Sequence, residues 1–168
     1  MSVLTAWRFC PRCATELERE PDHLHCPACG ERYWANSVPG AQAVIVRDGH
    51  VLLGRRAHDP GRGRWDLPGG FLHEAEDAVD ALRREVREET GLELELLEFL
   101  GTWNEPYWNR DVLCLTWVAR PSGGTEEAGD DLAEVRWFPV AERPRDDELA
   151  FPTFEEILSL ALARHEHA

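Results

Sequence analysis

The sequence has no long hydrophobic run. None of the apolar stretches in its 168 residues approaches the ~18 residues at which a membrane-spanning helix becomes a candidate. The first residues also lack the positively charged segment followed by an apolar one that marks a secretory signal. We therefore expect no membrane segment and a cytoplasmic location. The length allows one full domain with a hydrophobic core and at most a small extension.

Positive charge is also scarce. Lysine and arginine together number 18 against 32 aspartates and glutamates, which gives a formal net charge of −14. A surface this acidic repels phosphate backbones at long range, so we expect no nucleic-acid partner. A phosphorylated small molecule would instead have to be recruited by metal ions and a few local arginines.

Cysteine occurs only five times, and four of the five form two Cys-x-x-Cys pairs: Cys10, Cys13, Cys26 and Cys29. Paired turns of this kind let four thiolates surround one Zn²⁺ at roughly 2.3 Å each, and they are typical of metal binding rather than of a disulfide framework. Four sulfur ligands leave no open coordination position. We therefore expect a structural ion that supplies the folding energy of a segment too short to bury a core.

Three residues qualify this view of the cysteines. Ala14 follows the first pair at the position where Gly30, a turn-forming residue, follows the second. The fifth cysteine, Cys114, lies in an apolar segment and is expected to be a buried thiol without a metal.

Residues 70–92, which read GFLHEAEDAVDALRREVREETGL, are the most informative segment. Their pattern predicts a helix from Glu76 to Thr90 that ends at Gly91. Its buried stripe is expected to consist of Ala78, Val79, Leu82 and Val86.

Three glutamates lie on the opposite face of this predicted helix, at relative positions i, i+3 and i+4: Glu85, Glu88 and Glu89. Like charges near a helix C-terminus cost roughly a few tenths of a kcal/mol each. Helix stability alone therefore does not select them, whereas a bound divalent cation would reverse the sign of that cost. The alternative is a solvated acidic face that is balanced by neighbouring arginines: Arg83, Arg84 and Arg87.

The spacing of these residues resembles the signature of the Nudix hydrolases at every defined position. It reads Gly70, five residues, Glu76, seven residues, Arg84-Glu85-Val86, one residue, Glu88-Glu89, one residue, Gly91-Leu92. The preceding WDLPGG segment is similar to the lead-in of this signature, and the resemblance runs from about Ala41 to the C-terminus. It implies an α/β fold, a Nudix α/β/α sandwich with a mixed sheet. The segment in front of it, with its four paired cysteines, resembles a small zinc ribbon. We therefore predict a zinc ribbon over residues 1–35 and a Nudix hydrolase domain over residues 36–168.

The remaining segments show the strand and helix patterns that such a fold needs. Residues 41–46 and 50–55 flank Asp48-Gly49 and predict a β-hairpin. Further strands are expected over residues 92–100, 112–120 and 134–139, and loops over 34–40, 60–64 and 121–131. A last helix is expected over residues 153–165, with core positions at Phe154, Ile157, Leu158, Ala161 and Leu162.

The resemblance implies a catalytic site that uses Mg²⁺ or Mn²⁺. Mg²⁺ prefers oxygen ligands in octahedral geometry, and the expected ligands are Glu85, Glu88 and Glu89. In the family the backbone carbonyl at the position of Gly69 is often a further ligand. Arg84 is expected to orient Glu76 or a glutamate ligand through a charge-assisted hydrogen bond. The general base is either a glutamate of the signature or an acid on the downstream loop: Glu126, Glu127, Asp130 or Asp131.

Substrate recognition must come from residues outside the signature. Aromatic rings close to an arginine suit the stacking of a base and the binding of a phosphate, and such a group is formed by Trp103, Tyr107, Trp108 and Arg110. Packing in the core or in a loop is the alternative for these aromatics.

Two groups of ribbon-bearing relatives are similar to this arrangement. NADH pyrophosphatases carry a Ser-Gln-Pro-Trp-Pro-Phe-Pro array after the signature, which this chain lacks. Two segments, residues 149–153 and 129–138, resemble the corresponding segments of small hydrolases of FAD or ADP-ribose. Asp131 stands where those relatives tend to have glutamate. We expect hydrolysis of the diphosphate linkage in a nucleoside diphosphate joined to another moiety, of the FAD, NADH or ADP-ribose class. The expected partner is a small nucleotide, and a homodimer is left open.

Two other functions are compatible with parts of the sequence. The same chemistry on a different leaving group would make the protein a pyrophosphohydrolase of oxidised nucleoside triphosphates. A non-catalytic, ligand-sensing regulator would use the ribbon to contact nucleic acid, but the intact signature and the net charge of −14 argue against it.

Overall fold

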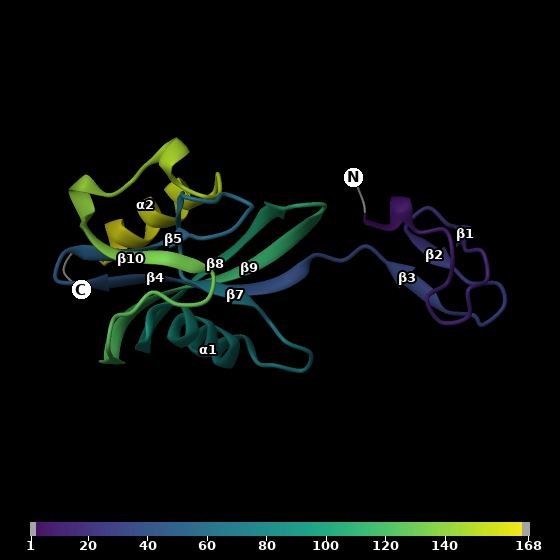
Figure 1. The fold of residues 1–168 in the computed structure, drawn as a ribbon, viewed down its shortest axis with the longest axis horizontal. Coiled ribbons are helices and arrows are strands. Elements are labelled where there is room, and N and C mark those ends of the chain that lie inside the picture. The colour runs from purple at the N-terminus through teal and green to yellow at the C-terminus, as the bar shows by residue number, and fades with distance from the viewer. Residues whose placement is uncertain (1–2, 166–168) are drawn as a thin grey trace.

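The computed structural model describes residues 3–165 and contains two separate sheets (Figure 1). The smaller sheet follows a short 3-10 helix, η1 (Val3–Ala6), and has three strands, β1 (Glu18–Arg19), β2 (His23–His25) and β3 (Arg32–Trp34). The larger sheet begins at Val38, so only residues 35–37 connect the two. The predicted loop over residues 34–40 is therefore shorter than expected.

The larger sheet has seven strands, with β10-β5-β4-β9-β8 as its order, β6 on β5 and β7 on β4. The strands β4 and β9 are parallel, and the other pairs of this sheet are antiparallel. The predicted mixed sheet is therefore confirmed. The bounds are β4 (Val38–Arg47), β5 (His50–Arg56), β6 (Trp65–Asp66), β7 (Gly69–Phe71), β8 (Leu92–Tyr107), β9 (Arg110–Gly124) and β10 (Leu132–Pro139).

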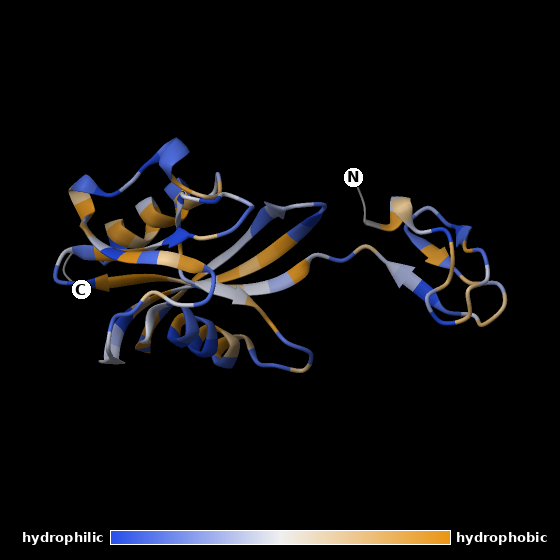
Figure 2. Cartoon of the chain, in the orientation of Figure 1, coloured by the Kyte–Doolittle hydropathy of each residue, from blue (hydrophilic) through white to orange (hydrophobic). Residues whose placement is uncertain are grey.

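Two helices, α1 (Ala78–Thr90) and α2 (Phe154–Arg164), cover opposite faces of this sheet (Figure 1). The central strand β4 shows why both faces need cover. Val44 and Val46 pack in the core cluster on the α2 side, and Ala43 and Ile45 pack in the cluster on the α1 side. Successive side chains of a strand point to opposite faces, so a strand buried on both faces reads as a continuous apolar run. Figure 2 shows this hydrophobic stretch along β4.

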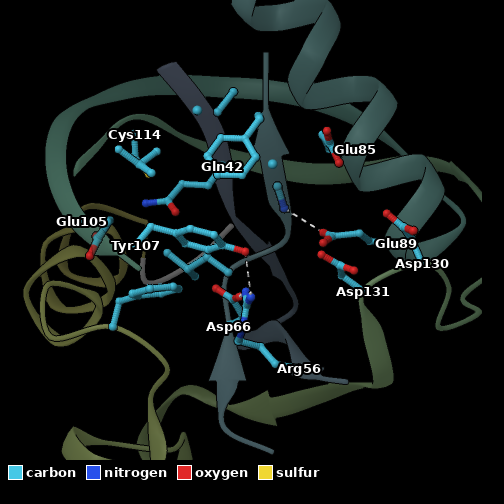
Figure 3. A pocket seen from close by; sticks show the side chains of 18 of the residues that line it. Gln42, Arg56, Asp66, Glu85, Glu89, Glu105, Tyr107, Cys114, Asp130 and Asp131 are labelled. Atoms are coloured by element: carbon cyan, nitrogen blue, oxygen red, sulfur yellow. Dashed lines mark hydrogen bonds and ion pairs between the residues drawn. The ribbon is translucent and has the colours of Figure 1, made fainter. Parts of the chain in front are cut away.

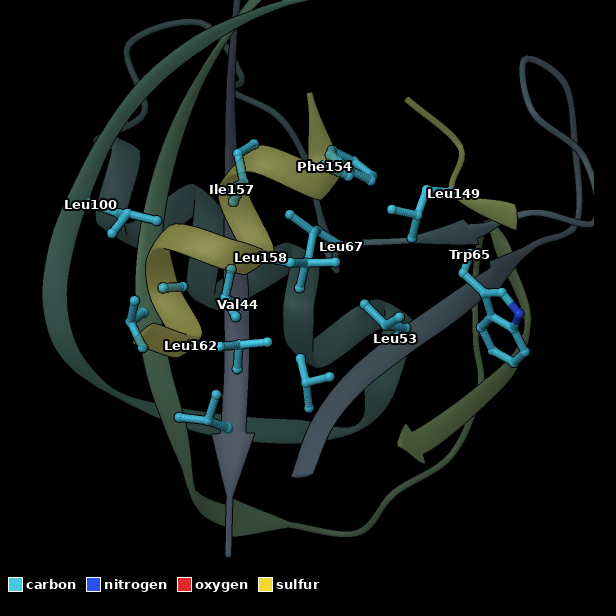
Figure 4. Packing of buried hydrophobic residues seen from close by; sticks show 14 of the residues in the cluster. Val44, Leu53, Trp65, Leu67, Leu100, Leu149, Phe154, Ile157, Leu158 and Leu162 are labelled. Atoms are coloured by element: carbon cyan, nitrogen blue, oxygen red, sulfur yellow. The ribbon is translucent and has the colours of Figure 1, made fainter. Parts of the chain in front are cut away.

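The core on the α2 side holds the larger of the two clusters (Figure 4). All five positions predicted for the last helix are buried: Phe154, Ile157, Leu158, Ala161 and Leu162. Two 3-10 helices, η2 (Val140–Glu142) and η3 (Asp146–Glu148), lead from β10 to this helix. No helix of residues 3–165 is long and apolar enough to cross a membrane.

The helix α1 starts two residues later than predicted. Asp77 is its N-cap and accepts a hydrogen bond from the Val79 backbone nitrogen at 2.9 Å, which fixes the start at Ala78. Gly91 ends the helix as predicted, in the left-handed conformation with φ 70°, and its N–H donates to the carbonyl of Arg87 at 3.0 Å.

The buried stripe of α1 is confirmed at Leu82 and Val86, whereas Ala78 and Val79 are only half-buried. The strands β8 and β9 are longer than predicted, because their hairpin continues to Tyr107 on one side and to Gly124 on the other. The segment expected as a loop over residues 121–131 therefore begins as part of β9.

The four paired cysteines converge in the smaller module. Their sulfur atoms all lie within 4.8 Å of one another, with 3.7 Å between Cys10 and Cys29 and 3.5 Å between Cys13 and Cys26. A tetrahedron with 2.3 Å metal–sulfur bonds has sulfur–sulfur edges of about 3.8 Å, so the cluster has the size that Zn²⁺ requires. The Tyr33 hydroxyl lies 3.1 Å from the Cys10 sulfur and orients it from outside the cluster.

The two cysteine turns have matching backbones. The N–H of Ala14 donates to the Cys10 carbonyl at 2.8 Å, and the N–H of Gly30 donates to the Cys26 carbonyl at 2.9 Å. Ala14 has φ 59° and Gly30 has φ 76°. The alanine therefore adopts the left-handed conformation usually left to glycine, at a cost of about 1–2 kcal/mol.

Replacing Ile157 by alanine should lower the free energy of unfolding by about 2–5 kcal/mol, because this fully buried side chain would leave a cavity in the α2 core. The exposed Glu156 of the same helix supplies the control, and Glu156→Gln should change it by less than about 0.5 kcal/mol. Chemical denaturation measures both. Equal effects of the two substitutions would contradict this core assignment.

Replacing Cys26 by serine should abolish binding of one zinc ion and unfold the small module while the larger sheet stays folded, because the metal supplies the folding energy of so short a segment. Elemental analysis and hydrogen exchange would report these two effects. Cys114→Ala, which lies outside the cluster, should retain a full complement of zinc. The interpretation is wrong if the Cys26 variant keeps its zinc.

Candidate functional site

A cavity of about 420 Å³ extends from α1 to the segment before α2, with walls from β4, β7, β8, β9 and the segment before β10 (Figure 3). Acidic side chains of α1 line one side, and Tyr107, Phe151 and Glu105 line the other. The strand β4 supplies the wall between them through Gly40, Ala41 and Gln42.

Three carboxylates converge at the mouth of the cavity. Glu85, Glu88 and Asp130 place one oxygen each within 4.8 Å of the others. The Glu85 side chain is 13% exposed and the Glu88 side chain 50%, so the group runs from the cavity wall out to solvent. Burial raises the pKa of Glu85, and hydrogen bonds from Arg84 oppose this. Several carboxylate oxygens facing one point are the donor set that Mg²⁺ or Mn²⁺ accepts.

Glu89 occupies a different position from its two neighbours in the signature. Its side chain is buried and accepts a hydrogen bond from the Gly69 backbone N–H at 2.8 Å (Figure 3). Burial raises its pKa well above the usual range, and the nearby charge of Asp66 raises it further. The predicted set of ligands is therefore divided, because Glu85 and Glu88 meet Asp130, whereas Glu89 meets Gly69.

Arg84 holds the acidic group together. Its guanidinium donates two hydrogen bonds to Glu76, at 2.9 and 2.8 Å, and lowers the pKa of that carboxyl to about 2. It also donates to Glu85 at 2.7 Å and to Glu88 at 3.2 Å. The structure thus places Arg84 against both of the partners expected for it. The alternative of a solvated acidic face balanced by arginines does not explain why Glu89 is buried.

Glycine at position 70 leaves room for the Glu85 side chain, because this strand lies close to α1. A Cβ atom there would lie 2.4 Å from the Cδ of Glu85, well inside van der Waals contact. The absence of a side chain at Gly70 therefore lets the Glu85 carboxylate reach the cavity wall.

Two further residues of the cavity wall, Arg56 and Asp66, were not predicted as site residues from the sequence. Arg56 is buried and pairs with the buried Asp66, and it also donates to the Pro60 carbonyl at 2.5 Å and to the Tyr107 hydroxyl at 3.5 Å. Its guanidinium lies 5.5 Å from the centre of the Phe151 ring. Each of these residues stands at a strand end or in a loop, where hydrophobic periodicity gives no signal, although the WDLPGG lead-in and the 149–153 segment contained two of them.

Of the four predicted substrate contacts, Tyr107 lines the cavity and the other three do not. Trp103 packs against the core on the α2 side and donates to Glu156 at 3.4 Å. Trp108 is 71% exposed at the β8–β9 turn, and Arg110 is exposed beside it.

The remaining predicted positions can also be located. Cys114 is buried as expected and lines the cavity, where burial raises its pKa to about 12. Of the acids considered as general base on the downstream loop, Asp130 and Asp131 line the cavity, whereas Glu126 pairs with Arg47 at 2.9 Å.

Two domain families match this chain. The NUDIX domain matches residues 37–157, and the NADH pyrophosphatase zinc ribbon domain matches residues 8–34. The ribbon match and the cluster of four cysteines together identify the small module as a zinc ribbon with a structural zinc site.

Two curated relatives are each 31% identical. One is the ADP-ribose pyrophosphatase of Methanocaldococcus jannaschii, similar over 118 residues that cover 68% of this chain and 69% of that protein. The other is the NAD-capped RNA hydrolase NudC of Chromobacterium violaceum, similar over 140 residues that cover 82% of this chain. The chain spans about half the length of this second relative, 52%.

A solved structure extends the likeness to both modules. The crystal structure of a NUDIX hydrolase from Nitrosomonas europaea superposes with a TM-score of 0.83 at 26% identity, and it covers 96% of this chain and 94% of that one. The fold predicted from the signature is therefore confirmed, including the ribbon in front of it. The chain belongs to the NUDIX hydrolase family and carries an N-terminal zinc ribbon of the kind named for NADH pyrophosphatases.

Proposed function

We propose that the protein hydrolyses the diphosphate linkage of a nucleoside diphosphate joined to another moiety, with Mg²⁺ or Mn²⁺ as cofactor. The observation that carries this proposal is a single cavity with clustered carboxylates on one side and aromatic rings on the other. A diphosphate would lie at the carboxylates and an attached ring system at Tyr107 and Phe151. The names of the two curated relatives, an ADP-ribose pyrophosphatase and an NAD-capped RNA hydrolase, support this substrate class.

In this proposal Glu85, Glu88 and Asp130 hold the divalent cation, since one oxygen of each already lies within 4.8 Å of the others. When bound, such a cation neutralises diphosphate oxygens and makes the phosphorus more electrophilic. Arg84 fixes the orientation of Glu85 and Glu88 before substrate arrives, so neither side chain has to be ordered during the reaction.

Glu89 is the residue that we assign as general base. It lines the cavity beside the carboxylate group, and its hydrogen bond to Gly69 holds one oxygen and leaves the other for a water molecule. A carboxylate accepts a proton from water most effectively when its pKa lies close to the working pH, and burial raises the pKa of Glu89 in that direction.

The remaining parts of the proposal concern the whole chain. We propose the division into residues 1–35 and 36–168, which the short connection between β3 and β4 supports. A cytoplasmic location is favoured because four thiolate ligands need reducing conditions. We favour a small nucleotide over RNA as substrate because of the net charge of −14, although one relative is named for a capped RNA.

A panel of substrates tests the reaction. The purified protein is incubated with Mg²⁺ or Mn²⁺ and with ADP-ribose, NADH, FAD, deoxynucleoside triphosphates or an NAD-capped RNA, and the products are separated by chromatography. Release of AMP and the partner monophosphate from a dinucleotide is the expected result. Higher kcat/KM on triphosphates, with release of pyrophosphate, would instead make the protein a nucleotide-pool enzyme. Higher kcat/KM on the capped RNA would overturn the preference for small molecules.

Replacing Glu88 by glutamine should lower kcat by ~100-fold or more on the best substrate of this panel, because the side chain keeps its size but loses the charge that binds the cation. The melting temperature should stay within a few degrees of the parent value. Glu93→Gln, at an exposed position outside the cavity, is the matched control and should keep normal activity. A Glu88 variant with near-normal kcat would falsify the assignment of this residue.

Replacing Gly70 by alanine should lower kcat/KM by roughly 10-fold or more, because the new methyl group displaces Glu85 from the cavity wall. Gly123→Ala introduces the same methyl group where it first meets the exposed Glu93 side chain, at 3.2 Å, and should leave kcat/KM nearly unchanged. Equal activity of the two variants would show that the position of Glu85 is unimportant.

A further inference from the structure

Glu105 of β8 is a buried carboxylate with one unused oxygen. Its side chain is 2% exposed, and its Oε1 accepts a hydrogen bond from the hydroxyl of Thr153. Its Oε2 is buried and has no hydrogen-bond partner in the part of the chain that the structure describes. Buried carboxylate oxygens are nearly always hydrogen-bonded, so an unpaired one on a residue that lines the cavity points to a ligand.

No ion pair among residues 3–165 involves Glu105, and no cation contributes to the shift of its pKa. Arg56, an arginine of the same cavity, pairs with Asp66 and donates to the Pro60 carbonyl. Toward the aromatic side its guanidinium donates to the Tyr107 hydroxyl and lies 5.5 Å from the centre of the Phe151 ring. The charge of Glu105 is therefore not neutralised by an arginine.

Glu105 lies on the side of the cavity opposite the acidic group of α1 (Figure 3). The rings of Tyr107 and Phe151 stand beside it, at 25° to one another with centroids 6.2 Å apart. Both rings line the cavity, where an aromatic side chain can pack against a planar heterocycle. Gln42 adds a second polar group. Its amide nitrogen donates to the Thr116 hydroxyl at 3.1 Å, and its amide oxygen has no hydrogen-bond partner among residues 3–165.

We propose that Glu105 selects the heterocycle of the substrate by accepting a hydrogen bond from an amino group on that ring. This rests on the proposed diphosphate hydrolysis, since the ring must belong to a nucleotide whose diphosphate reaches Glu85 and Glu88. Two parts of a dinucleotide carry the required group, namely the exocyclic amine of adenine and the carboxamide of nicotinamide.

The free oxygen of Glu105 also rejects certain ligands. A ring with a carbonyl or carboxylate at the same place would present an acceptor to a buried acceptor oxygen. A site built to hydrogen-bond one group discriminates strongly against an analogue that lacks it, because the buried partner is left unpaired. Burial raises the pKa of Glu105, so the preference applies at a pH above this raised pKa, where the carboxyl is ionised and accepts.

Paired analogues test the proposal on the unmodified protein. One pair compares ADP-ribose with its hypoxanthine counterpart, and the other compares NAD with its nicotinic acid counterpart. We expect kcat/KM to be roughly 100-fold lower for the analogue in at least one pair, and the affected pair identifies the half of the substrate that Glu105 contacts. Ratios within about 3-fold in both pairs, or a preference for an analogue, would overturn the proposal.

A variant assigns the effect to this residue. Glu105→Gln keeps an oxygen for an amino ligand and can also turn its amide N–H₂ toward a carbonyl, so the 100-fold gap should shrink to less than about 10-fold. Glu95→Gln on the same strand is the matched control, because Glu95 is exposed and pairs with Arg120, and it should keep the full gap. An unchanged gap in the Glu105 variant would overturn the assignment.

Binding of the products separates this inference from the proposed reaction. Calorimetry without divalent metal compares AMP with IMP, and nicotinamide mononucleotide with nicotinate mononucleotide. Selective binding that depends on Glu105, in a protein that hydrolyses none of the panel, would support the selectivity and refute the reaction. Hydrolysis without any selectivity in either assay would support the reaction and refute the selectivity.

Discussion

The guanidinium of Arg84 links the signature helix to the sheet and also links acidic side chains of this segment to one another. It donates to Glu76 before the helix, to Glu85 and Glu88 on the helix, and to the Phe71 carbonyl of β7 at 3.1 Å. Without this cation three carboxylates would repel one another at a site partly withdrawn from water. The acidic face of α1 can lie against β7 because one planar group with several donors satisfies these acceptors together.

Local sequence predicted the elements with fixed spacing. The cysteine turns, Gly91 and the core positions of α2 each follow from a pattern a few residues long, and all were recovered. The position of Glu89 was not, because spacing on an ideal helix gives a direction but not the surroundings. Only the packing of α1 against the strands shows that Glu89 is buried beside Gly69 while Glu88 faces solvent.

The aromatic side of the cavity was the least predictable part. Gln42, Glu105 and Phe151 come from segments far apart in the chain, and their meeting depends on the pairing of strands. Trp103 and Trp108 are close neighbours of Tyr107 in sequence, yet one packs in the core and the other is exposed. Trp103 lies four residues before Tyr107 on β8 and Trp108 lies in the turn that follows the strand, so the three rings have different surroundings. Proximity in sequence therefore overstates the size of the recognition group.

The short connection between the ribbon and β4 has a consequence for how the two modules can vary. The strand β4 begins at Val38, is hydrogen-bonded to β9 and β7, and reaches the cavity within three residues at Gly40 and Ala41. Because β4 is buried on both faces, sliding it by one residue would exchange the contents of both cores. Any change in the orientation of the ribbon must therefore occur through the backbone torsion angles of residues 35–37, because the register of β4 is fixed.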